Sequence, residues 1–225
     1  MCYNVDERNP NFKTKKGDKS MAVKYKYGNY NPGKFKMDKK LVKQLRPEAY
    51  SFKQGFVDLG DVASMLKYSM KKGDTQPAVV VSVDPLLVAC YAADMDAVAL
   101  LCLPTEYGML RNYQVGTRLL TVNSYDLDRQ NKKRRSEDIF EGEHTSGRFR
   151  MYGPLIADLY TKNKKRLEAI KVQIPEEVWT YVEELGEVYM ERNPGMARNG
   201  LGNRFCTAVP ISEIKFHPKM KLPRA

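Results

Sequence analysis

Two nearly unbroken runs of apolar residues, Leu86–Ala92 and Ala97–Leu103, occupy the middle of the chain. A short polar break containing Asp94 and Asp96 separates them, and the length of each run is typical of a β-strand. The pattern therefore predicts a hairpin, with the two aspartates as turn formers at its tip. Because the apolar positions are continuous and do not alternate, we expect both strands to be buried on both faces at the centre of a sheet.

Weaker patterns extend this sheet. Residues 78–83 are rich in β-branched side chains, which predicts another strand, and a fourth is expected at residues 117–125. Short strands are also expected at residues 149–152, 205–209 and 211–216. Residues 195–204 are rich in glycine and asparagine, which indicates a loop.

Helical spacing of apolar residues predicts the remaining elements. It is clearest at residues 175–192, where Val178, Val182 and Tyr189 share a face and the neighbouring Trp179 is expected to pack in the core. Asp38 is suited to cap a helix over residues 38–46. The other expected helices cover residues 61–72, 106–112 and 154–173, and the last could be broken near Asn163.

These elements predict the α+β class, with a central, mostly antiparallel sheet of about four to six strands flanked by helices. A length of 225 residues fits one domain. We place a basic Tyr- and Lys-rich N-terminal arm at residues 1–36, a single α+β domain at 37–216 and a basic C-terminal tail at 217–225.

Charge makes the ends of the chain distinctive. The formal net charge is +11, and the excess of Lys and Arg lies before residue 47 and after residue 214. Inside the near-neutral body, one run without apolar residues, residues 129–135, is strongly basic. Such segments attract polyanions through counterion release, although basic tails can also serve only to keep a protein soluble. A membrane surface is the weaker interpretation, because no basic amphipathic helix carries large apolar anchors.

Aromatic residues in the arm alternate with lysines and could stack on bases or dock on the body through their large apolar area. We favour docking for this group. The residues predicted to contact a polyanion are Lys24, Tyr25, Lys26, Tyr27, Lys34, Lys36, Arg129, Lys132, Lys133, Arg134, Arg135, Arg198, Arg204, Lys219 and Lys221.

A search for chemistry finds no strong motif. Glu141, Glu143 and His144 could share a metal ion, but a solvated loop is the better interpretation, so no metal or cofactor is predicted. Gly200 and Gly202 form an anion-friendly turn that is more simply a connecting loop. The four cysteines are expected to be free thiols, since none forms a CxxC pair.

Three functions stay open at this point. We favour a nucleic-acid or nucleoprotein binding protein that grips phosphate largely without sequence specificity. The first alternative is a structural or assembly protein, such as a virion or scaffold component, with homo-oligomer formation. The second is a small enzyme that holds an anionic substrate near residues 195–204; catalysis is the less favoured of the two alternatives. No membrane partner is expected, and the absence of a signal-like or roughly 20-residue apolar segment favours the cytoplasm.

Overall fold

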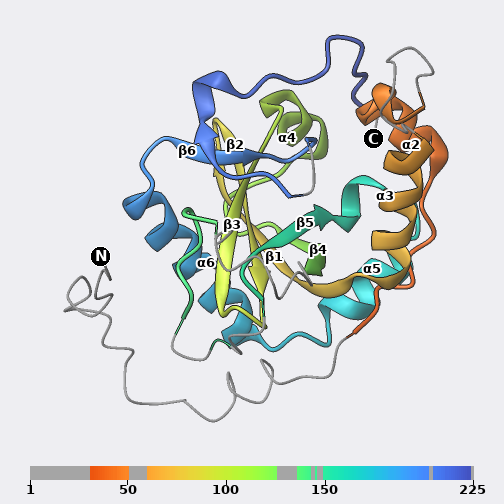
Figure 1. The fold of residues 1–225 in the computed structure, drawn as a ribbon. Coiled ribbons are helices and arrows are strands. Elements are labelled where there is room, and N and C mark those ends of the chain that lie inside the picture. Colours follow the sequence, from red (N-terminus) through yellow and green to blue (C-terminus); the bar gives the residue numbers. More distant parts are fainter. Residues whose placement is uncertain are drawn as a thin grey trace.

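The computed structural model describes residues 31–50, 60–125, 136–142, 145, 149–202 and 205–223. Its helices, in chain order, are α2 (Lys39–Leu45), α3 (Gly60–Lys72), α4 (Thr105–Arg111), α5 (Lys164–Lys171) and α6 (Glu176–Arg192). Three short 3-10 helices, η1 (Pro47–Tyr50), η2 (Ala157–Leu159) and η3 (Ile211–Glu213), connect other elements. Helices and a central sheet together confirm the α+β class (Figure 1).

The sheet has seven strands in the order β5-β4-β1-β2-β3-β6-β7. Their bounds are β1 Asp74–Val83, β2 Leu86–Ala92, β3 Ala97–Leu103, β4 Arg118–Tyr125, β5 Tyr152–Ile156, β6 Met196–Asn199 and β7 Val209–Pro210. Neighbouring strands are antiparallel except β3 and β6, which are parallel. The sheet is therefore larger than the predicted four to six strands, because β6 and β7 extend it past the hairpin.

The predicted hairpin is confirmed and forms the centre of the core. β2 and β3 pair without a register shift from Leu86 and Leu103 to Ala92 and Ala97. Every residue of both strands is buried. Apolar burial on both faces stabilises a central strand most strongly, which explains why these runs carry no polar alternation.

Helix α6 covers one face of β1, β2 and β3. Gly186 makes this close approach possible, since a Cβ there would lie 2.7 Å from Cγ1 of Val81 and 2.9 Å from Cβ of Ala89. Trp179 is buried, as predicted. Helices α2, α3 and α5 lie together at the other side of the molecule, beyond β4 and β5 (Figure 1).

The cap of α2 follows from local sequence. The Asp38 carboxylate accepts hydrogen bonds from the backbone N–H groups of Lys40 and Leu41, which satisfies two donors at the start of α2. The predicted helix over residues 61–72 is confirmed as α3. Residues 106–112 form the short α4 and residues 175–192 form α6, which starts one residue after Pro175.

Three expectations are wrong. Residues 154–173 do not form one helix: Pro154 to Ile156 complete β5, η2 follows, and α5 starts at Lys164, directly after the expected break near Asn163. Residues 195–204 are not wholly a loop, because Met196–Asn199 form β6. The two expected edge strands at residues 205–216 reduce to Val209–Pro210, followed by η3. Which of these residues form strands depends on pairing with distant strands, and the local sequence pattern does not show that pairing.

None of the helices in the described ranges is both long enough and apolar enough to cross a membrane.

Candidate nucleic-acid interface

Four of the predicted polyanion contacts, Lys34, Lys36, Lys219 and Lys221, lie in described and exposed positions. The predicted contacts Lys24, Tyr25, Lys26, Tyr27, Arg129, Lys132, Lys133, Arg134, Arg135 and Arg204 lie outside the described residues, as do Glu143 and His144. The remaining predicted contact, Arg198, is buried.

Lys34 and Lys36 are held against the end of α3. The backbone N–H of Lys34 donates to the carbonyl of Lys71 at 3.2 Å, and that of Phe35 donates to the carbonyl of Met70 at 2.9 Å. Phe35 is buried, so the predicted docking of the arm's aromatics is confirmed for this one residue. The arrangement places Lys34 and Lys36 beside the lysines at the C-terminus of α3.

The start of α2 is joined to the segment before α5. The backbone N–H of Asp38 donates to the Tyr160 carbonyl at 2.8 Å, and the Thr161 hydroxyl donates to the Lys36 carbonyl at 3.0 Å. The Lys162 ammonium lies 2.8 Å from the Asp38 carboxylate, and this hydrogen bond is the main cause of the lowered pKa of Asp38. Lysines of α2 and of the α5 region therefore share one surface.

The C-terminal segment runs back to α2. The backbone N–H of Lys221 donates to the carbonyl of Gln44 at 2.8 Å, and Met220 and Leu222 pack against the core. This contact brings Lys219 and Lys221 next to the lysines of α2, from the opposite end of the chain.

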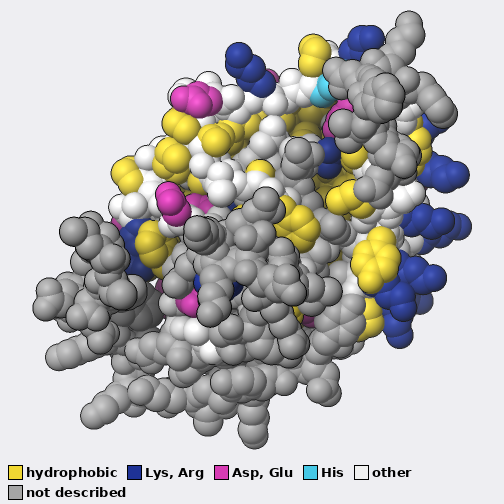
Figure 2. Space-filling model, in the orientation of Figure 1, with side chains coloured by type: hydrophobic (Ala, Val, Ile, Leu, Met, Phe, Trp, Pro, Cys, Tyr) yellow, Lys and Arg dark blue, Asp and Glu magenta, His cyan; other side chains and the backbone are white. Residues whose placement is uncertain are grey.

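We call the resulting surface the basic face. Its members are all exposed lysines: Lys34, Lys36, Lys39, Lys40, Lys43, Lys67, Lys71, Lys72, Lys162, Lys164, Lys165, Lys219 and Lys221. Lys and Arg side chains gather along the edge of the molecule that α2 and α3 form (Figure 2). Most of these lysines were not singled out from the sequence, where they are scattered over separate helices. The exposed spacing of Lys67, Lys71 and Lys72 on α3 is the signal that could have found them.

Helix α6 is acidic, in contrast to the lysine-rich basic face. Its acidic residues are Glu176, Glu177, Glu183, Glu184, Glu187 and Glu191, and its basic residue is Arg192. Since α6 lies on β1–β3 and α2, α3 and α5 lie beyond β4 and β5, the glutamates of α6 and the lysines of the basic face occupy different sides of the described structure (Figure 1). Such a separation orients a charged ligand during approach.

The prediction that Arg198 contacts a polyanion at the surface is wrong. Its side chain is 0% exposed, and Nε lies 2.7 Å from Oδ2 of Asp138. Nη2 donates to Oδ1 of Asp138 at 2.9 Å and to the Ser136 hydroxyl at 2.8 Å, and Nη1 donates to the Tyr152 carbonyl at 3.0 Å. A guanidinium that has these partners within the chain is a structural group, because a buried charge is stable only when it is paired and hydrogen-bonded.

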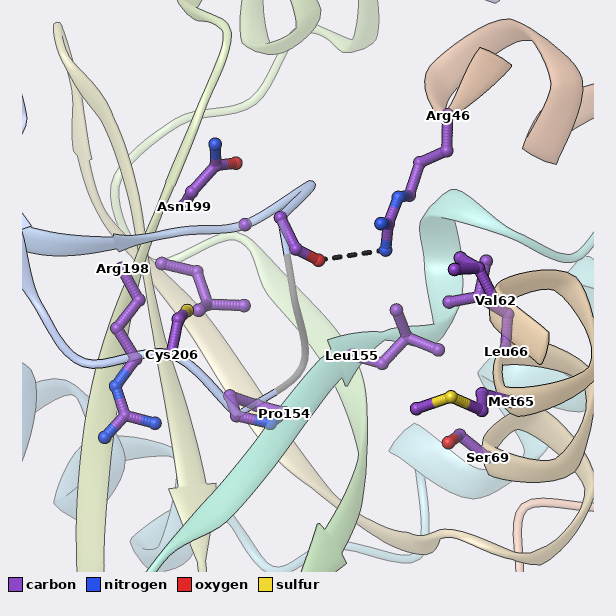
Figure 3. A pocket seen from close by; sticks show the side chains of 13 residues that line it. Arg46, Val62, Met65, Leu66, Ser69, Pro154, Leu155, Arg198, Asn199 and Cys206 are labelled. Atoms are coloured by element: carbon purple, nitrogen blue, oxygen red, sulfur yellow. Dashed lines mark hydrogen bonds between the residues drawn. The ribbon is translucent and has the colours of Figure 1, made fainter. Parts of the chain in front are cut away.

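A cavity of about 50 Å³ lies between α3, β5 and the segment that follows β6 (Figure 3). It is lined mainly by apolar side chains, among them Val62, Leu66 and Leu155. Arg46 closes one side, with Nη1 donating to the Gly202 carbonyl at 2.9 Å, while the Arg198 side chain points away from Arg46. The volume is well below the roughly 150 Å³ of a cavity that holds benzene, so the cavity suits groups the size of water.

The described cysteines are not activated as nucleophiles. Burial raises the pKa of Cys90 to about 12 and that of Cys102 to about 11, and it also raises the pKa of Cys206. All three thiols are therefore protonated near neutral pH, and the thiolate is the nucleophilic form. The described residues contain no group of three His, Cys, Asp or Glu side chains arranged to hold a metal ion.

Comparison of the chain with protein-family models, with curated proteins and with solved structures found no match.

Proposed function

We propose that this protein binds nucleic acid through the basic face, mainly by phosphate contacts and without sequence specificity. One observation supports this most directly: exposed lysines from residues 34–36, α2, α3, the α5 region and the C-terminal segment lie on one side of the molecule. Location in the cytoplasm is part of the same proposal.

The chemistry of the face favours phosphate over bases. Lysine is a compact point charge on a flexible stem, whereas arginine offers a planar fork that reads base edges in pairs of hydrogen bonds. Two described arginines beside the face are engaged within the chain: Arg46 contacts Glu48 and Gly202, and Arg166 donates to the Gly33 carbonyl at 2.9 Å. The exposed lysines of the face can neutralise phosphates but carry little sequence information.

A salt titration tests the proposal. The full chain is mixed with fluorescent single-stranded and duplex oligonucleotides, and the binding constant is measured at several salt concentrations. The logarithm of the constant should fall linearly with the logarithm of the salt concentration, by about 0.9 per duplex phosphate neutralised and about 0.7 per single-strand phosphate.

A charge-matched pair of variants separates the face from net charge. The triple variant Lys39→Gln, Lys40→Gln and Lys165→Gln removes three exposed lysines of the basic face, and it should reduce the single-strand slope by about 2. The control Gln114→Glu, Thr180→Glu and Ser212→Glu changes the net charge equally at exposed positions elsewhere. Binding that is absent at low salt, or equal slopes for the two triple variants, would refute the proposal.

The alternatives have less support in the described residues. Assembly into a homo-oligomer is a separate prediction, which light scattering tests directly. An enzyme acting near residues 195–204 loses one of the arginines proposed to hold its anionic substrate, since Arg198 is buried.

A further inference from the structure

One exposed aromatic side chain, Tyr68, lies among the lysines of α3. Tyr68 is 66% exposed. Helix α3 turns Leu66, Ser69 and Met70 toward the core. Lys71 and Lys72 follow Tyr68 by three and four positions, the spacing at which helical side chains are neighbours. Tyr68 is therefore an accessible ring within the basic face.

Among the described residues, the other aromatic side chains near the basic face are less accessible. Phe35 is 3% exposed, and the Arg166 guanidinium lies 5.8 Å from its ring centroid. The Lys43 ammonium lies 5.4 Å from the centroid of Tyr50, and Tyr160 is fully buried. By contrast, no ring contact or cation–π contact to Tyr68 occurs within the part of the chain that the structure describes.

We infer that the ligand of the basic face is a single-stranded nucleic acid and that one of its bases stacks on Tyr68; this inference rests on the proposed function. Lysines alone would bind any polyanion, because they respond to phosphate charge. An exposed ring adds binding energy only where a base can leave its own stack and lie against the ring. In a duplex the base faces are covered by neighbouring base pairs, so Tyr68 discriminates in favour of the single strand.

Binding of a single strand needs an aromatic ring on which a base can stack and positive groups that contact the phosphates on either side. Here the ring and the nearest charges stand on the same helix, Tyr68 with Lys67, Lys71 and Lys72. Stacking does not depend on base identity, because every base has a π-face. The inference is therefore consistent with binding that has little sequence preference.

Substitution of Tyr68 tests the inference. The full chain and its variants Tyr68→Ala and Tyr68→Phe are titrated with an oligothymidylate of roughly 15 nucleotides, a duplex of the same length, and vesicles of phosphatidylserine and phosphatidylcholine. Tyr68→Ala should weaken single-strand binding by roughly 5- to 150-fold, the range for loss of one stacked base. Duplex affinity should change less than about twofold, and Tyr68→Phe should keep single-strand affinity, because its ring is retained.

Met109→Ala is the matched control, since Met109 is an exposed apolar residue on α4, outside the basic face. It should leave single-strand binding unchanged. Circular dichroism melting of each variant checks folding, and all of these positions are exposed, so the expected change in stability is within about 0.5 kcal/mol.

The outcomes distinguish this inference from the proposed function. If Tyr68→Ala binds the single strand as wild type does, while the triple lysine variant binds it weakly, the inference is overturned and the proposed function stands. Equal loss for single strand and duplex also overturns the inference. Salt-dependent binding to vesicles with none to either nucleic acid, or no binding at all, overturns both.

Discussion

Replacing Asp138 by asparagine should destabilise the protein more than most single substitutions. The change keeps the shape of the side chain but removes its charge and turns one acceptor oxygen into an NH₂ group. The Asp138 carboxylate accepts hydrogen bonds from Nε and Nη2 of Arg198 and from the hydroxyls of Tyr189 and Ser136. Arginine stays protonated in proteins, so the variant retains a buried positive charge without a negative partner.

The expected magnitude follows from burial. Side-chain exposure is 0% for Arg198 and 6% for Asp138, so water does not replace the lost partner. Breaking a buried ion pair by removing one member costs about 3–5 kcal/mol. Natural domains have a total unfolding free energy of about 5–15 kcal/mol. The variant should therefore lose about a fifth or more of its stability and melt roughly 6–20 °C lower, at about 2–4 °C per kcal/mol for a chain of this size.

Urea unfolding followed by circular dichroism measures the loss. The midpoint should decrease while the slope of free energy against urea stays constant, because the same surface is exposed on unfolding. The double variant Asp138→Leu, Arg198→Met provides the second measurement. It removes both charges, so it should be less destabilised than Asp138→Asn, even though the Tyr152 carbonyl loses a donor.

The pH dependence gives an independent check. Burial by itself raises the pKa of Asp138, but the hydrogen bond and charge of Arg198 hold it below its usual value. Stability from this depressed pKa is present above the unfolded value of about 4 and is lost as pH falls through the folded pKa. The difference in unfolding free energy between wild type and Asp138→Asn should therefore become smaller as the pH falls. A loss below about 1 kcal/mol at neutral pH would refute the reasoning, because it would mean that the Arg198 guanidinium reaches solvent in the variant.

Three further predictions concern the core. Gly186→Ala should cost about 1–3 kcal/mol in urea unfolding, because its Cβ would overlap Val81 and Ala89; the exposed neighbour Glu187→Ala is the control, and an equal effect of the two would contradict this packing. Burial raises the pKa of Asp74 despite hydrogen bonds from Gln76, Tyr125 and the backbone of Asn31. The wild-type melting temperature should therefore fall as the pH rises from about 4 through the raised pKa. The melting temperature of Asp74→Asn should lack this decrease. Identical curves of melting temperature against pH for the two proteins would exclude Asp74 as the cause. Lys171→Met should cost about 3–5 kcal/mol, since it leaves the Asp158 carboxylate, 2.9 Å from the Lys171 ammonium, without its charged partner. Glu168→Gln, which affects only the exposed partner of Lys171, should cost at most about 1 kcal/mol, and a comparable loss for both variants would disagree with the difference in burial.

Local pattern was sufficient for the centre of the fold. The continuous apolar runs at Leu86–Ala92 and Ala97–Leu103 correctly predicted two adjacent strands buried on both faces. Asp38 correctly marked the start of α2 through its side-chain hydrogen bonds. These features depend on residues close together in the chain, where periodicity, turn formers and caps act directly.

Strands that depend on distant partners could not be predicted in the same way. The local pattern predicts a helix that begins at Pro154, yet residues 152–156 form β5, which pairs with β4. At the edge of a sheet a proline is tolerated, since one side of the strand needs no ladder hydrogen bond. Likewise, Met196–Asn199 form a strand because β3 pairs with them in parallel.

The sequence by itself determined the composition of the charged segments, the two central strands and the helices with clear amphipathic spacing. Only the tertiary structure decided which charges act at the surface: it gathered lysines from both ends of the chain onto the basic face and buried Arg198 against Asp138, sixty positions away. The physical reason is that periodicity and capping are local properties, whereas the free energy of a charge depends on its solvent exposure and its nearest opposite charge. Long-range packing sets both of these quantities.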